Sequence, residues 1–119
     1  MAVATAFVGH YNTTFDADRA QLAPLYQDGS MLTFEGTQIQ GQAAIIEHLA
    51  TKLTFQTSQT HVTTMDAQPT NGGILVYVTG NIVVDGDAEK ALKYSHIFHL
   101  LPAGEAFWVQ NDMFRLTYF

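Results

Sequence analysis

The 119-residue sequence contains no cysteine, so it can form neither a disulfide framework nor a thiolate metal site. Basic residues are also few. Five Lys and Arg stand against eleven Asp and Glu, which gives a formal net charge of −6. Nucleic acids and anionic membrane surfaces are bound through basic patches, so neither is a favourable partner. A basic patch on another protein is the more natural one.

Charged residues of either sign are scarce as well. They make up 13% of the chain, about half the share of an ordinary soluble domain, whereas apolar residues make up 47%. So few charges leave apolar surface that a homo-oligomer could bury. No apolar run approaches the length of a membrane span, and the N-terminus lacks the basic segment of a signal peptide. We therefore expect a single domain, residues 1–119, in the cytosol or nucleus.

The first half of the chain has helical periodicity. Apolar residues recur every fourth position over Val3–Phe15 and predict an amphipathic helix. Asp18 is expected to cap a second, short helix. A short strand is predicted at Met31–Glu35, and a third helix over Gln42–Leu53, because its apolar residues again recur at helical spacing.

From Thr57 onward the apolar period becomes 2, which is typical of strands. Long strands rich in Val, Ile, Thr and aromatics are predicted at Gln59–Gln68, Ile74–Val84, Ala91–Leu101 and Phe107–Tyr118. Short connections predict antiparallel hairpins, and Gly80 predicts a bulge or sharp bend. The expected fold is α+β: a cone of three N-terminal helices packed on a strongly bent antiparallel sheet, with a hydrophobic cavity. The outer face of such long strands suits a dimer better than water.

Two groups of polar residues could carry chemistry. His96 and His99 resemble a metal-binding pair, but on a strand they point to opposite faces, so we expect no shared metal. Asp112, His96 and Tyr94 could form an acid/base site in the cavity, because Tyr94 and His96 share a strand face. The alternative is that these three residues pack and hydrogen-bond within the core.

Acidic residues gather at two further places. Asp85, Asp87 and Glu89 lie on one predicted hairpin turn, where Asp-Gly is ordinary turn chemistry and a calcium loop would need more ligands. They could also contact a partner's Lys or Arg. Glu35 follows Phe34, and an acid beside an aromatic at a cavity mouth would suit a partner that inserts an apolar side chain flanked by basic ones.

Several stretches, in order along essentially the whole chain, resemble the nuclear transport factor 2 family. They are Phe15–Leu22, Met31–Gly36, Gln40–Gly41, Phe55–Gln56, Asp66–Pro69 and Asn111–Leu116. Members of this family are dimeric carriers that take the small GTPase Ran, in its GDP form, through nuclear pores. The resemblance implies a non-enzymatic homodimer without a cofactor, present in cytoplasm and nucleus and concentrated at the nuclear pore.

The resemblance also implies a binding mechanism, in which an aromatic side chain of Ran enters the hydrophobic cavity and acids at its mouth pair with basic neighbours. The implied Ran-binding acids are Glu35, Asp85 and Asp87. The implied cavity residues are Phe34, Leu53, Leu92, Met113 and Phe114. Asp16 matches an acid near the site for FxFG repeats of nucleoporins.

Two other functions are compatible with the same fold. One is a small-molecule enzyme of the ketosteroid isomerase or scytalone dehydratase type, which would need a deep cavity with convergent polar groups. The other is a heterodimerising scaffold module.

A difficulty also arises at Met113 and Phe114, which point to opposite faces of an ideal strand. Both can line one cavity only if the strand bends or bulges there.

Overall fold

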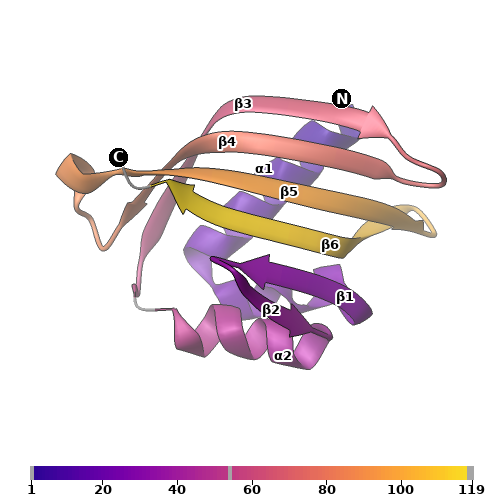
Figure 1. The fold of residues 1–119 in the computed structure, drawn as a ribbon, viewed down its shortest axis with the longest axis horizontal. Helices are drawn as coiled ribbons and strands as arrows, with labels where there is room; N and C mark the ends of the chain where they lie inside the picture. Colours follow the sequence, from indigo (N-terminus) through magenta and orange to yellow (C-terminus); the bar gives the residue numbers. More distant parts are fainter. Residues whose placement is uncertain (1, 54, 118–119) are drawn as a thin grey trace.

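The computed structural model describes residues 2–53 and 55–117 (Figure 1). The elements, with η for helices that are not α-helical, are α1 (Ala2–Ala17), η1 (Arg19–Leu25), β1 (Tyr26–Phe34), β2 (Thr37–Gln40), α2 (Gln42–Glu47), η2 (His48–Lys52), β3 (Ser58–Pro69), β4 (Ile74–Val84), η3 (Ala88–Lys90), β5 (Leu92–Ala103) and β6 (Ala106–Thr117). The end of the last predicted strand, Tyr118, lies outside the described residues.

The first two predicted helices are confirmed. The inward stripe of α1 buries Phe7, Tyr11 and Phe15, as the fourfold spacing predicts. The side chain of Asp18 accepts a hydrogen bond from Ala20 N (3.1 Å) and so caps η1. These contacts fix where the chain leaves α1 and turns back toward the sheet.

Two elements differ in detail from the sequence prediction. The predicted helix Gln42–Leu53 is α-helical only to Glu47 and continues as the wider π-helical turn η2. Strand β1 begins before the predicted Met31, and its pairing with β6 is irregular between Tyr26 and Met31. Ser30 holds this irregular segment to β6, because its hydroxyl donates to Val109 O (2.5 Å).

The sheet has the order β2-β1-β6-β5-β4-β3. The hairpins from β3 to β6 are antiparallel, as predicted, whereas β1 and β6 run parallel. The irregularity predicted at Gly80 is also present: β3 shifts register between Val62 and Thr64, opposite this glycine. A Cβ atom at Gly80 would lie 2.0 Å from His61 O, so only glycine fits there.

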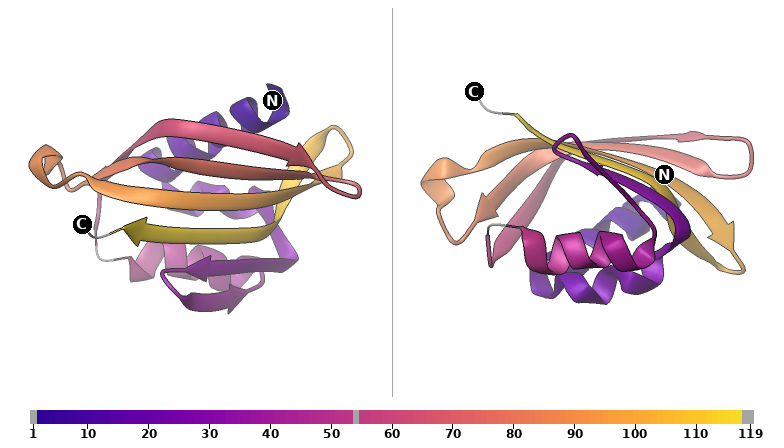
Figure 2. Two further views of the ribbon diagram at one scale, coloured as in Figure 1. Left: turned by 45° about the horizontal axis from the view of Figure 1, so that its top comes forward. Right: turned by 60° about the horizontal axis from the view of Figure 1, so that its bottom comes forward.

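The helices α1, η1, α2 and η2 lie on one face of the curved sheet, η3 lies in the connection between β4 and β5, and none of the described helices covers the other face (Figure 2). Side chains alternate accordingly along β4: Val76 and Val78 are buried, whereas Leu75 and Tyr77 are exposed. The predicted α+β fold is therefore confirmed, with its core between helices and sheet. In the part of the chain that the structure describes, no helix has the length and apolar character needed to span a bilayer.

Candidate functional site

A pocket of about 420 Å³ opens between one end of the sheet and the helical turn η2, and we call it the mouth pocket. It is lined by Phe34, Glu35, Thr37, His48, Lys52, Leu53, Phe55, Ile82, Val84, Asp85, Leu92, Phe114 and Leu116. Most of the side chains that the resemblance assigns to Ran binding thus lie together. The volume falls within the range of about 300–1,000 Å³ that is typical of ligand pockets.

Stacked aromatic rings form the inner wall of the mouth pocket. Phe34 and Phe114 are partners in the parallel pairing of β1 and β6, so their rings face each other. The ring centroids lie 4.8 Å apart with an angle of 10° between the planes. The ring of Tyr94 continues the stack beyond Phe114 at 5.6 Å. The wall is therefore apolar and held in place by its own packing.

Glu35 stands on the rim, in the turn between β1 and β2. Its φ of 51° lies in the left-handed region, and its backbone N donates to Phe114 O (3.0 Å). Its carboxylate accepts a hydrogen bond from Leu116 N. The turn therefore presents the acid beside the ring stack and attaches it to the last part of β6.

Asp85 forms another acidic part of the rim, at the end of β4. Its Oδ1 accepts hydrogen bonds from Gln56 N (2.9 Å) and Thr57 N (3.1 Å). These backbone bonds, that from Thr57 first, lower the pKa of Asp85 below its ordinary value of 3.8. The exposed carboxyl is therefore ionised at neutral pH. Asp87, by contrast, is exposed on the following turn and does not line the pocket.

Met113 does not belong to the mouth pocket, which corrects the assignment taken from the resemblance. Its side chain is 48% exposed on the outer face of the sheet, where it lines a separate groove with Leu75 and Ile97. The pairing of β6 with β5 is regular through Met113 and Phe114. Since no bulge intervenes, neighbouring side chains point to opposite faces, and only Phe114 faces inward.

Asp16 connects α1 to β3. Its carboxylate accepts hydrogen bonds from Ser58 Oγ (2.7 Å), Thr60 N (2.8 Å) and Thr60 Oγ1 (2.8 Å). These bonds anchor the end of α1 on the sheet. Whether Asp16 also contacts nucleoporin repeats stays a prediction.

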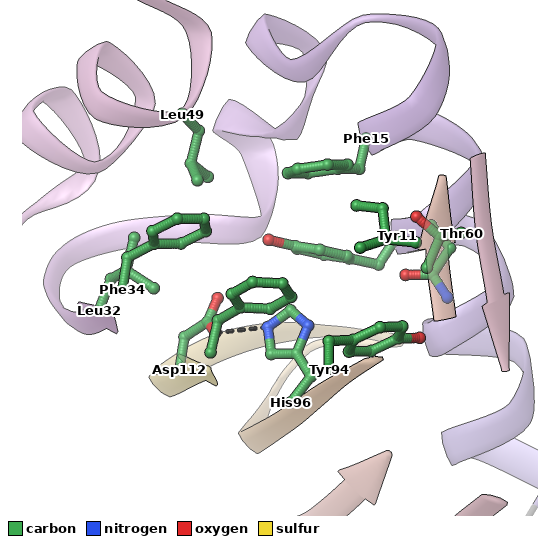
Figure 3. Close-up of a pocket in the computed structure, with 12 residues that line it drawn as sticks. Tyr11, Phe15, Leu32, Phe34, Leu49, Thr60, Tyr94, His96 and Asp112 are labelled. Carbon is green, nitrogen blue, oxygen red and sulfur yellow. Dashed lines mark hydrogen bonds and ion pairs between the residues drawn. The ribbon is translucent and has the colours of Figure 1, made fainter. Parts of the chain in front are cut away.

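Behind the ring stack lies a smaller space of about 20 Å³, which we call the inner chamber (Figure 3). Asp112 Oδ1 and His96 Nε2 are 2.6 Å apart, and Tyr26 donates its hydroxyl hydrogen to Asp112 Oδ2 (2.5 Å). Since that hydrogen is engaged, Tyr11 must donate in its bond to Tyr26 (2.8 Å). Sequence reasoning missed both tyrosines, although a buried tyrosine generally needs a partner.

The inner chamber is too small for a substrate, because its volume holds about one water molecule. Burial, and then the nearby Asp112, raise the pKa values of Tyr11 and Tyr26, so both stay protonated donors. Tyr94 is buried too, which raises its pKa to about 12. Its hydroxyl makes no hydrogen bond of normal geometry in the described part of the chain, although the nearby Asn12 side chain interacts with it. Asp112 and His96 thus pack and hydrogen-bond within the core.

The other histidine of the predicted pair lies on the opposite face of β5. The ring nitrogens of His99 contact Thr70 Oγ1 (3.1 Å) and Asn111 Oδ1 (3.1 Å), whereas His96 faces Asp112. The prediction that the two histidines do not share a metal site agrees with this geometry. Across residues 2–53 and 55–117, no cluster of three or more His, Asp or Glu is placed to hold a metal ion.

The chain that carries this aromatic wall and these acids matches a known family along most of its length. Residues 3–116 match the Nuclear transport factor 2 (NTF2) domain. The chain belongs to this family. It is 51% identical to Nuclear transport factor 2B of Arabidopsis thaliana, over 98% of this chain and 94% of that protein. It is 54% identical to Nuclear transport factor 2 of Oryza sativa, over 98% of this chain and 96% of that protein.

A solved NTF2 structure agrees with these sequence matches. The structure of Ntf2 from Cryptosporidium parvum superimposes with a TM-score of 0.91 at 42% identity, over 98% of this chain and 93% of that one. These relatives are named as transport factors and not as enzymes. The chain is accordingly a nuclear transport protein of the NTF2 family.

Proposed function

We propose that this chain, as one domain of residues 1–119, is a homodimeric carrier that binds GDP-bound Ran and brings it into the nucleus. It also binds FxFG-repeat nucleoporins. It moves between cytoplasm and nucleus and is concentrated at the nuclear pore. The mouth pocket carries this proposal, because an aromatic wall and acids meet there on one rim. This combination suits a partner that inserts an aromatic ring and surrounds it with basic side chains.

The two parts of the pocket have different physical roles. An aromatic side chain buries about 150–250 Å² of surface, which makes the apolar wall the main source of affinity. Glu35 and Asp85 supply negative potential that steers a basic partner and fixes its orientation. Asp87, exposed on the adjacent turn, extends this potential toward solvent.

The outer face of the sheet is proposed as the dimer interface. It presents Leu75, Tyr77 and Met113 as exposed large apolar side chains. A second copy of the chain would cover them, in keeping with the low charge content of the sequence. Replacing Ile97, which lines the groove on this face, with Glu should give a monomer in sedimentation equilibrium. A variant that sediments like the wild type would place the interface elsewhere.

Calorimetric titration of the chain with Ran loaded with GDP or with GTP tests the proposed cargo. We expect heat of binding with the GDP form and little with the GTP form. Equal affinity for both forms, or no binding to either, would refute the proposal.

Titration with an FxFG peptide tests the second ligand. Asp16→Asn removes the charge and keeps only one of the two oxygens that accept from β3, so thermal unfolding must first show that the variant is folded. Weaker peptide binding by a folded variant would support a role for Asp16.

A further inference from the structure

The two walls of the mouth pocket carry charges of opposite sign. The acids Glu35 and Asp85 stand at ends of β-strands, on the sheet side. His48 and Lys52 line the same pocket from η2, on the helix side. They are four residues apart, so their side chains leave neighbouring positions of the helical surface.

Lys52 is available to a partner. Its ammonium group lies 3.6 Å from Glu47 Oε1, and the two side chains are 63% and 62% exposed. An ion pair in water contributes little, about 0–1 kcal/mol, so Lys52 can exchange this contact for another at small cost. The positive charge on the helix wall is thus accessible, and only an exposed ion pair holds it.

His48 contributes packing to this wall but no charge, so Lys52 is the charged residue that the helix side of the pocket contributes. Its ring meets Phe34 edge-on, with centroids 5.3 Å apart. Its Nε2 is buried and has no hydrogen-bond partner among residues 2–53 and 55–117. Burial, and then the nearby Lys52 ammonium, lower the pKa of His48 from its ordinary value of 6.5, so the ring is neutral at pH 7.

We propose that the mouth pocket selects a segment of mixed charge: an aromatic side chain flanked by Lys or Arg toward the Glu35 wall and by Asp or Glu toward Lys52. This inference rests on the proposed carrier function and adds the acidic half of the partner. A wholly basic segment would be attracted by the net charge of −6 but would meet a like charge at Lys52. Such repulsion is how charged interfaces reject wrong partners.

The substitution Lys52→Glu separates this inference from simple attraction between a negative chain and a basic partner. It makes the chain more negative, so general attraction predicts tighter binding of GDP-loaded Ran. The proposed contact predicts weaker binding, by about three- to tenfold. Lys52→Gln should give an intermediate loss. Lys90→Glu, which changes the net charge equally but does not line the pocket, should bind as tightly as the wild type or tighter.

Calorimetric titration with GDP-loaded Ran reads out all variants, and thermal unfolding checks that each is folded. The inference is supported if both Lys52 variants bind more weakly while Lys90→Glu does not. The inference would be overturned, and the carrier function left standing, if the wild type binds, Glu35→Gln binds more weakly, and Lys52→Glu binds as tightly as the wild type or tighter. No binding by the wild type would overturn both.

Discussion

The inner chamber and the mouth pocket share the rings of Phe34 and Phe114, but they use polar groups in opposite ways. In the chamber, the carboxyl group of Asp112 is almost fully buried and is bonded by His96 and Tyr26. At the mouth, the charged groups stand at the surface around an open apolar space. The residues that resemble catalytic groups therefore stabilise the core, and those that face a partner lie outside it.

Asp112→Ala should have the largest effect and should act on stability. The carboxyl group joins β1 to β5 across β6, so its removal leaves the buried side chains of His96 and Tyr26 without their partner. Breaking a buried pair of this kind costs about 3–5 kcal/mol. Chemical denaturation of Asp112→Ala measures the loss, with Asp112→Asn as a milder variant of similar shape. A loss below about 1 kcal/mol would show that the network is not structural.

Glu35→Lys should have the next largest effect and should act on binding. A like charge facing the basic groups of the partner costs several kcal/mol, so the affinity for GDP-loaded Ran should be lost. Glu35→Gln is the cleaner test, because its amide oxygen can still accept from Leu116 N. We expect it to bind about tenfold more weakly at unchanged thermal stability. Unchanged affinity in both variants would remove Glu35 from the binding site.

Salt should also distinguish the two regions. The Debye length falls from about 10 Å at 0.1 M salt to about 3 Å at 1 M, so the exposed charges of the rim are screened. We expect affinity for GDP-loaded Ran to fall several-fold over this range, as calorimetry would show. The hydrogen bonds of Asp112 are sealed from solvent and should persist. A flat salt series would mean that the rim charges do not contribute to binding.

Acid pH should weaken the hydrogen bonds of Asp85 at the mouth pocket, whereas neutral pH leaves them intact. Because the pKa of Asp85 is lower in the folded protein, its contribution to stability is fully present above the ordinary value of 3.8. That contribution is lost as the pH falls through the lowered folded value. We expect the amides of Gln56 and Thr57, which bond to this carboxylate, to exchange faster with solvent there than expected from pH alone. Asp85→Asn should abolish this change, and an identical pH profile in the variant would contradict it.

Tyr94→Phe should have the smallest effect. The hydroxyl is buried and makes no hydrogen bond of normal geometry in the described residues, where only the Asn12 side chain interacts with it, so removing it relieves a poorly satisfied polar group. We expect a change in unfolding free energy of at most about 1 kcal/mol, toward greater stability. A large loss in chemical denaturation would show that the hydroxyl has a partner that matters, such as an ordered water.

Local patterns in the sequence were enough for much of the fold. Apolar residues recur at every fourth position in α1 and at every second position in β4, and each pattern can be recognised from residues that are close in the sequence. The parallel pairing of β1 and β6 was not predictable in this way, because it joins strands from the two ends of the chain. The same holds for the hydrogen bond from Tyr26 to Asp112, whose partners are 86 positions apart.

The residues of the candidate site were assigned through the resemblance, and the structure places two of them, Asp87 and Met113, outside the mouth pocket. Phe34, Glu35 and Asp85 reach the mouth pocket because the turns that carry them are short and placed by strand ends. Met113 was assigned to the cavity although it adjoins Phe114 on a strand. The alternation of side chains across a sheet placed it on the outer face, and the sequence alone contained that objection.

Methyl NMR during a titration with GDP-loaded Ran tests the contrast between the two regions most directly. Leu53 and Leu92 line the mouth pocket only, whereas Leu32 and Leu49 line the inner chamber only. If the partner inserts its aromatic ring at the mouth, the methyl signals of Leu53 and Leu92 will shift strongly and those of Leu32 and Leu49 will not. Shifts confined to Leu32 and Leu49, or none in either pair on binding, would contradict the account.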